Sequence, residues 1–280
     1  CDELPGSVVE LQVVNCPALL MLPNTDKLLR LEVSNCNRFL NLSYLSTNVV
    51  MKQLILRGPF IKRIDIFSRY LESISLPESL VFLQMERCPA MDNLKLPESL
   101  WELVISNDPQ YYLDHQDEKI LPKIPRLPSK LRRLTILGGD GWTSLKHLPP
   151  LPSSLTHLEL RNCDGIRALP VLPNSLMRLG VYQCQDLQAM PELPKSLKQF
   201  ELERAAVMVA LPPLPSGLTQ LKLEDCFVLK EVPKLPSSLT SLKINNCMLL
   251  TKLPPLPKSL THLEVVSCSS MKSVPKLHKH

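Results

Sequence analysis

Cysteine is the residue type in this chain whose spacing could do chemistry. Five cysteines in the second half of the chain lie 21 or 42 residues apart: Cys163, Cys184, Cys226, Cys247 and Cys268. Thiolates at a fixed spacing could bind zinc, form disulfides or act as nucleophiles. Which of these roles they can fill depends on the elements that carry them.

The cysteines belong to copies of one motif, S-L-x-x-L-x-L-x-x-C. It begins at Leu155, Leu176, Leu197, Leu218, Leu239 and Leu260, and looser copies begin at Val8, Leu28, Met51, Leu80, Leu100 and Leu131. The third and fifth residues after each start are apolar in all twelve copies. This alternation predicts a short strand with one buried face. A unit of 21 residues cannot bury that face alone, so the copies are expected to stack into a parallel sheet.

Proline is the second recurring residue, with 27 prolines against 8 glycines. Most fall in a Leu-Pro-x-Leu-Pro segment between copies, as in residues 169–173. Interior prolines break helices, so we expect little helix. The segment is typical of an extended, polyproline-like return along the convex side, with its leucines pointing inward.

The motif resembles the leucine-rich-repeat signature, L-x-x-L-x-L-x-x-(N/C)-x-L. The fold that this implies is a leucine-rich-repeat solenoid of the α/β-type repeat class. It would have a mostly parallel β-sheet on the concave face, polyproline-like or 3-10 convex segments, and little helix. We expect residues 1–280 to form a single leucine-rich-repeat domain of about twelve repeats, a fragment without terminal caps, because the chain stops part-way through a return segment.

Two subtypes of the repeat are similar to this one. The short Leu-Pro-x-Leu-Pro unit resembles the repeats of bacterial effectors delivered by type III secretion, which implies a secreted effector that acts on a host protein. Cysteine at the turn, as in Asn162-Cys163, also resembles the repeats of plant intracellular immune receptors. The alternative function is therefore the ligand-recognition repeat domain of such a receptor.

Within this fold the cysteines are expected to form a buried column of free thiols that donate to backbone carbonyls in the turn. Neighbouring rungs lie close enough for disulfides, but parallel side chains do not converge to form them. Zinc at Cys226, Cys247 and Cys268 would need converging thiolates, which an apolar column opposes. A catalytic cysteine would occur once, beside a base. We expect no metal, no cofactor and no enzyme activity, and a reducing intracellular compartment, such as the host cytoplasm after secretion.

The partner-binding face is expected on the sheet, at the residues two, four and six after each start. Nine of these are acidic and seven are basic. This mixture, with a net charge of only +5, favours a protein partner and excludes a phosphate-tracking nucleic-acid groove. No apolar run is long enough for a membrane span. The alternative is a solvated face whose charges pair between rungs, such as Glu201 beside Lys222.

Large and arginine side chains on that face are the candidate binding residues, because such groups dominate protein interfaces. The densest group is Arg133, His157, Glu159, Arg161, Arg178 and Tyr182. Phe82 is also expected to face outward. No Ser–His–Asp grouping surrounds His157, so an enzyme is the weaker hypothesis.

Two irregular spacings interrupt the first half of the chain. Leu100 and Leu131 are 31 residues apart, and the extra segment contains Tyr111 and Tyr112 among acidic residues. Inserted loops often carry function, so this segment is a candidate partner contact; the alternative is a tolerated loop. Met51 and Leu80 are 29 residues apart.

Overall fold

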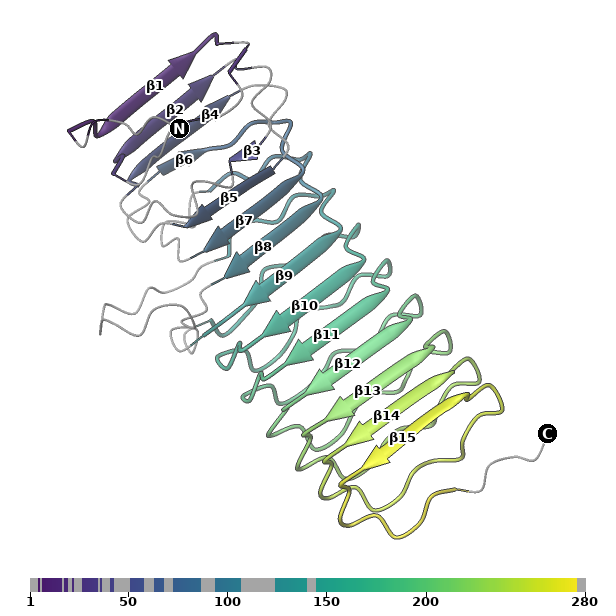
Figure 1. Cartoon of the computed structure of the whole chain (residues 1–280). Coiled ribbons are helices and arrows are strands. Elements are labelled where there is room, and N and C mark those ends of the chain that lie inside the picture. The colour runs from purple at the N-terminus through teal and green to yellow at the C-terminus, as the bar shows by residue number, and fades with distance from the viewer. Residues whose placement is uncertain are drawn as a thin grey trace. The chain divides into compact units, whose positions relative to one another are not determined.

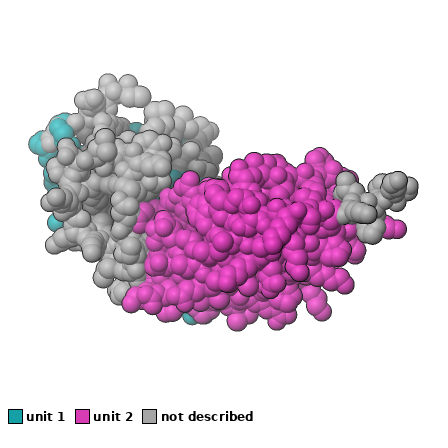
Figure 2. Space-filling model, turned by 90° about the horizontal axis from the view of Figure 1, so that it is seen from below, with its two compact units in different colours: residues 1–137 teal, residues 138–280 magenta. Residues whose placement is uncertain are grey.

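The structure is a computed structural model that divides into two compact units, Cys1–Leu137 and Gly138–His280 (Figure 2). It describes residues 5, 7–16, 18–19, 22, 27–34, 36, 41–42, 51–57, 63–67, 73–86, 94–106, 124–139 and 145–275. These residues contain strands, turns and extended segments, and no helix. The low helix content agrees with the proline pattern.

Every motif copy forms a strand that begins two residues after its start. These twelve strands are β1 (Glu10–Val14), β2 (Arg30–Ser34), β4 (Gln53–Arg57), β7 (Phe82–Glu86), β8 (Glu102–Ser106), β9 (Arg133–Leu137), β10 (His157–Arg161), β11 (Arg178–Tyr182), β12 (Gln199–Glu203), β13 (Gln220–Glu224), β14 (Ser241–Asn245) and β15 (His262–Val266). Three further strands, β3 (Asn41–Leu42), β5 (Arg63–Phe67) and β6 (Ser73–Ser75), lie outside the motif. The predicted strands are confirmed.

The second unit contains six regular rungs. Its strands β10 to β15 are parallel, and each residue pairs with the one 21 positions later, as Leu158 does with Leu179 and Leu179 with Phe200 (Figure 1). The apolar residues of β10 to β14 are at most 1% exposed, with Phe200 the largest among them. Burial of this aliphatic column at about 25 cal/mol per Å² is the main force that stacks the rungs.

Two turns shape each rung. The first follows the strand, where the amide of Ile166 donates to the carbonyl of Cys163 at 3.1 Å. An extended return segment then leads to the second turn, where the amide of Leu176 donates to the carbonyl of Pro173 at 3.0 Å. No described strand contains proline. The prolines of the second unit occupy the return segments and their turns, where a missing amide donor costs nothing.

Side-chain hydrogen bonds tie successive rungs together. The serine before the motif leucine donates to the carbonyl one rung earlier: Ser175 to Leu155 at 2.6 Å, and Ser196 to Leu176 at 2.7 Å. Each described motif cysteine donates to the carbonyl two residues before it, as Cys163 does to Arg161 at 3.2 Å. Each copy of the motif therefore supplies hydrogen-bond donors, from its serine and its cysteine, as well as apolar side chains for the core. These donors satisfy carbonyl groups, as buried polar groups require.

The residue before the column position, which is cysteine in most rungs and Ala205 in one, has a left-handed backbone conformation. Its φ lies between 53° and 56° at Asn15, Asn162, Gln183, Arg204, Asp225, Asn246 and Ser267. Asparagine and aspartate, which tolerate this conformation best among residues with a side chain, fill four of the seven positions. This requirement explains why asparagine so often precedes the cysteine.

The first unit contains two sheets, which corrects the expectation that every motif strand pairs with the next. β4 pairs with β6, whereas β7 pairs with β5 and β8, so the strand after Met51 does not pair with the strand after Leu80. Strands β1, β2, β4 and β6 form one sheet, and β3, β5, β7, β8 and β9 are successive neighbours in the other (Figure 1). The 29-residue spacing holds β5 and β6, one strand for each sheet, and this shifts the motif from one sheet to the other.

Candidate protein-binding surface

The sheet of the second unit presents a mixed charged face. The outward positions of β10 to β15 hold the acidic residues Glu159, Glu201, Glu203, Glu224 and Glu264 and the basic residues Arg161, Arg178, Lys222 and Lys243. The apolar residues between them point into the core. The two sets alternate because successive strand residues point to opposite faces.

A network of five residues lies at the centre of β10 to β12. The Arg161 guanidinium lies over the Tyr182 ring, 4.0 Å from its centroid, and its Nε donates to Oε1 of Glu159. The Tyr182 hydroxyl donates to Oε2 of Glu201 at 2.8 Å, and Nη2 of Arg178 donates to the other oxygen of Glu201 at 3.1 Å. The network joins three neighbouring strands, so the side chains brace one another.

The network leaves its two arginines available for a partner. The side chains of Arg161 and Arg178 are 47% and 46% exposed, whereas Tyr182 is only 6% exposed. Tyr182 lies on the expected face, but Arg161 covers its ring. Arg161 and Arg178 are therefore the exposed groups, and Tyr182 supports them from below.

Gly180 makes room for the Tyr182 ring, a role that the sequence analysis missed. A Cβ atom at position 180 would lie 2.6 Å from Cε2 and 2.8 Å from the hydroxyl oxygen of Tyr182. Gly180 pairs with Glu159 on one side and Glu201 on the other. A glycine at an outward strand position two residues before a tyrosine was the available signal, because glycine in a strand often marks a close approach.

The environment of Tyr182 changes its acidity. Burial, followed by the hydrogen bond to Glu201 and the charge of that residue, raises the pKa of Tyr182 to about 12. The hydroxyl therefore stays protonated, and donates to Glu201, throughout the physiological pH range.

The other charges on this face also pair. Glu201 is beside Lys222 in the sheet register, as expected, but the ion pairs run elsewhere: Lys222 contacts Glu224 on its own strand at 2.6 Å. Lys243 contacts Glu264 on the next strand at 3.2 Å. Pairing between rungs therefore occurs at Lys243, whereas the predicted pairing of Glu201 with Lys222 does not. Exposed pairs of this kind contribute about 0–1 kcal/mol to stability.

Three other candidate residues lie on described strands: His157 on β10, Phe82 on β7 and Arg133 on β9. His157 is half-buried, with Nδ1 2.9 Å from Oγ1 of Thr156. Phe82 and Arg133 belong to the first unit, where the Arg133 guanidinium lies 5.2 Å from the centroid of the exposed Trp101 ring. Trp101 follows a motif start directly and was not among the expected outward positions. Tyr111 and Tyr112 lie outside the described residues.

The cysteine column is described at seven positions, all of them free thiols. Cys36, Cys163, Cys184, Cys226 and Cys247 are buried, as expected. The expectation is wrong for Cys16, which is exposed, and for Cys268, which is only half-buried. Both follow edge strands, β1 and β15, so no further rung covers them. A hydrogen bond with Cys184, together with burial, raises the pKa of Cys163; Cys226 and burial do the same for Cys247. Both thiols therefore stay protonated and unreactive.

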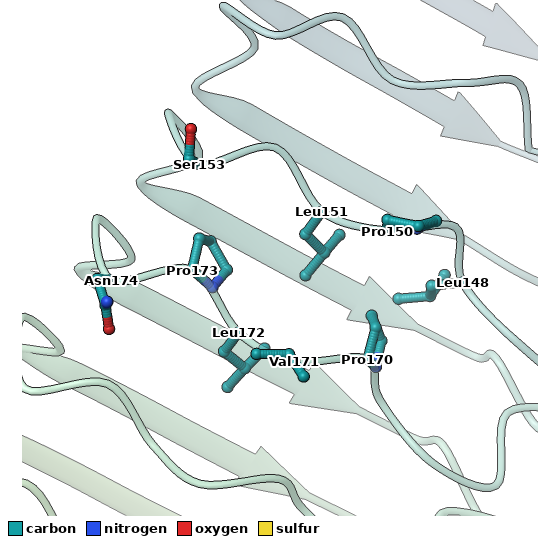
Figure 3. Close-up of a pocket in the computed structure, with 9 residues that line it drawn as sticks. All are labelled: Leu148, Pro150, Leu151, Ser153, Pro170, Val171, Leu172, Pro173 and Asn174. Carbon is teal, nitrogen blue, oxygen red and sulfur yellow. The ribbon is translucent and has the colours of Figure 1, made fainter.

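The side opposite the sheet carries shallow grooves between return segments. One groove of about 620 Å³ lies between residues 148–153 and residues 170–174 (Figure 3). Leu172 points into the rung, while Val171 lies at the margin of the groove and is 86% exposed. Proline, leucine and valine line most of this groove, which holds no charged side chain.

Within the part of the chain that the structure describes, no three histidine, cysteine or acidic side chains are grouped to hold a metal ion. The same residues form no helix with the length and hydrophobicity to cross a membrane.

Solved structures identify the fold. No protein-family model and no curated protein sequence matches the chain. A leucine-rich-repeat protein from Bacteroides ovatus matches 97% of this chain and 77% of its own, with a TM-score of 0.50 and 17% identity. YopM from Yersinia enterocolitica matches 98% of this chain and 67% of its own, with a TM-score of 0.41 and 22% identity. YopM from Yersinia pestis, a leucine-rich effector protein, matches 94% of this chain and 84% of its own, with a TM-score of 0.47 and 23% identity.

The likeness to the Bacteroides protein agrees with the parallel strands and the 21-residue rungs. The chain is a leucine-rich-repeat solenoid.

Proposed function

We propose that this chain is a protein-binding scaffold whose contact face is the outward face of β10 to β15. The observation that carries the proposal is the braced network under Arg161 and Arg178. Their head groups are about half exposed, yet each is held by a carboxylate. Arginines fixed in this way lose little conformational entropy when a partner binds, and arginine is among the residues favoured at the energetic centre of interfaces.

The charge of this face favours a protein over a nucleic acid. Its outward positions hold five acidic and four basic residues, and each of the four basic residues pairs with one of the acidic ones. A phosphate backbone needs an uninterrupted basic surface, and the five carboxylates would repel it. A protein with a complementary pattern of charges would instead gain specificity from the same residues.

We further propose that the chain acts as a secreted effector on a host protein. The support is the Leu-Pro-x-Leu-Pro unit, which resembles the repeats of type III effectors, and the buried free thiols, which suit a reducing compartment such as the host cytoplasm.

A capture experiment tests both proposals. The chain, its Arg161→Glu/Arg178→Glu variant and its Lys234→Glu variant would be immobilised and exposed to eukaryotic and bacterial lysates, with quantitative mass spectrometry as the readout. Lys234 is an exposed residue on the return side and provides a matched charge reversal. We expect a protein from the eukaryotic lysate to be retained by the wild-type chain and by Lys234→Glu, and lost from the double variant.

Two results would count against these proposals separately. Equal retention by all three baits would exclude the sheet face as the contact surface. Retention that depends on the sheet face but comes only from the bacterial lysate would leave the scaffold standing and contradict the effector role.

A further inference from the structure

A second surface of the second unit carries exposed apolar residues. Val207, Val209, Phe227, Met248 and Leu249 are between 39% and 48% exposed. They follow β12, β13 and β14, and the turns after these strands lie side by side along one edge of the sheet (Figure 1). We call these five residues the exit-edge patch.

The patch is confined to three consecutive rungs. The positions of Phe227-Val228 and Met248-Leu249 are occupied in the two preceding rungs by Asp164-Gly165 and Gln185-Asp186, and in the following rung by Ser269-Ser270. The repeat therefore does not require apolar residues here, because the same turn is built with polar ones. A contiguous apolar patch with polar neighbours on both sides is typical of an interaction surface.

Side-chain hydrogen bonds connect the three turns that carry the patch. Nε of Arg204 donates to Oδ2 of Asp225 at 3.0 Å, and Nδ2 of Asn246 donates to Oδ1 of Asp225 at 2.7 Å. The Asn246 hydrogen bond, followed by that from Arg204, lowers the pKa of Asp225, so this carboxylate remains charged at neutral pH. The network holds the patch in one arrangement before any partner arrives, which lowers the entropic cost of binding.

Basic residues outnumber acidic ones around the patch. Lys230, Lys252 and Lys272 are exposed on the rungs of β13, β14 and β15. Of the two carboxylates near them, Glu231 is exposed and Asp225 is already hydrogen-bonded to Arg204. Lys230 is one rung beyond Val209, whose carbonyl accepts from the Lys230 amide at 3.2 Å. The surface thus combines apolar area with positive charge, and its complement is an amphipathic segment with apolar and acidic side chains.

We propose that the exit-edge patch is a second docking site, separate from the sheet face, which binds an acidic amphipathic segment of a partner protein. The apolar side chains of the segment would cover Phe227, Leu249 and their neighbours, and its carboxylates would contact the three lysines. The turn amides of Arg204, Asp225 and Asn246 already donate to the next rung, so the proposed contacts are made by side chains.

The test is selection from a library of random linear peptides displayed on phage. Baits would be the wild-type chain, Phe227→Ser/Leu249→Ser, Lys230→Glu/Lys252→Glu and Val171→Ser. The first variant installs serine, which this chain already uses at the equivalent positions Ser269 and Ser270 in the rung of β15. Val171→Ser removes an apolar, exposed side chain from the return side. Circular dichroism and thermal unfolding would establish that each bait is folded, and the lysine variant changes only exposed residues.

We expect the wild-type chain and Val171→Ser to enrich peptides that combine leucine or aromatic residues with aspartate and glutamate. Binding of these peptides should weaken at least about tenfold on each of the two patch variants, which is about 1.4 kcal/mol. Any of three outcomes would overturn the proposal: no such peptides are enriched, they bind the patch variants as well as the wild type, or sedimentation velocity shows that the patch joins two copies of this chain.

Discussion

At the scale of single residues, the repeat places cysteine, a residue type that could be reactive, where it has a structural role. The column position after each strand selects a small side chain that can donate weakly to a carbonyl, and cysteine meets both needs. Because successive thiols are buried side by side, their pKa values rise at Cys163 and Cys247. The same arrangement that invites a metal or disulfide interpretation from the sequence therefore suppresses the thiolate at Cys163 and Cys247. At Cys226 the hydrogen bond with Cys247 instead lowers the pKa, so burial alone protects that thiol.

Thiol labelling tests this account of the column. In native protein we expect Cys16 to react quickly with an aromatic disulfide reagent, and Cys163, Cys184, Cys226 and Cys247 to react only after denaturation. Mass spectrometry of the labelled peptides would identify each site. Rapid labelling of Cys163 or Cys226 in the folded chain would contradict the buried column.

The raised pKa of Tyr182 predicts how the stability of the folded chain depends on pH. Its pKa is about 12 in the folded chain and about 10 in an unfolded one. The folded state therefore holds the proton more tightly. The stabilisation that results is complete below pH about 10 and is lost as the pH rises through about 12. We expect the tyrosinate absorbance of the wild type, minus that of Tyr182→Phe, to titrate near 12.

Gly180→Ala provides the matched test of the ring's position. The new methyl group would meet the Tyr182 ring, so the ring must move away from Glu201. We expect the Tyr182 titration to shift toward its ordinary pKa in this variant. An unchanged titration would show that the ring does not depend on Gly180.

At the scale of elements, the sequence predicted the strands well because their signal is redundant. Two apolar columns, a serine and a cysteine recur together, and all twelve predicted strands occur. Strand pairing was less predictable. β5 and β6 carry no motif, and their existence decides that β4 and β7 belong to different sheets. A spacing of 29 residues reveals an insertion, but it does not reveal which sheet the inserted strands join.

On the sheet face, too, the positions of residues were predictable and their contacts between rungs were not. The alternation of residues correctly placed Arg161, Arg178 and Tyr182 on one face. The burial of Tyr182 depends on Gly180 and on the stacking of Arg161, and these contacts between rungs follow from side-chain conformations. Trp101 was missed because it precedes its strand, where alternation makes no prediction.

Gly138 begins the turn after β9, and a substitution there tests how closely the backbones of neighbouring turns approach each other. A Cβ atom there would lie 2.1 Å from the carbonyl oxygen of Asn162, which is backbone and cannot easily move. We expect Gly138→Ala to lower the free energy of unfolding by about 1–3 kcal/mol, the usual cost of overpacking. Chemical denaturation measures the change. Ser237→Ala, at an exposed turn, should change it by less than about 0.5 kcal/mol, and equal effects of the two substitutions would contradict this close approach.

At the scale of the molecule, the regular stack determines what the chain can bind. Each rung of the second unit adds three outward side chains at a spacing of about 4.8 Å. Adjacent rungs can therefore build composite features, such as the arginine network on the sheet face and the exit-edge patch beside it. Both rest on the buried column of leucines, so a binding defect is meaningful only for a variant that remains folded.

Titration calorimetry with the captured partner is the most direct test of the central claim, that the sheet face of the second unit binds a protein. We predict that Arg161→Glu with Arg178→Glu weakens binding by at least about 2 kcal/mol, because both exposed anchors are reversed while Glu159 and Glu201 remain. Lys234→Glu should change binding by less than about 0.5 kcal/mol. If the folded double variant binds as tightly as the wild type while Lys234→Glu weakens binding, the partner contacts the return side and the claim is wrong.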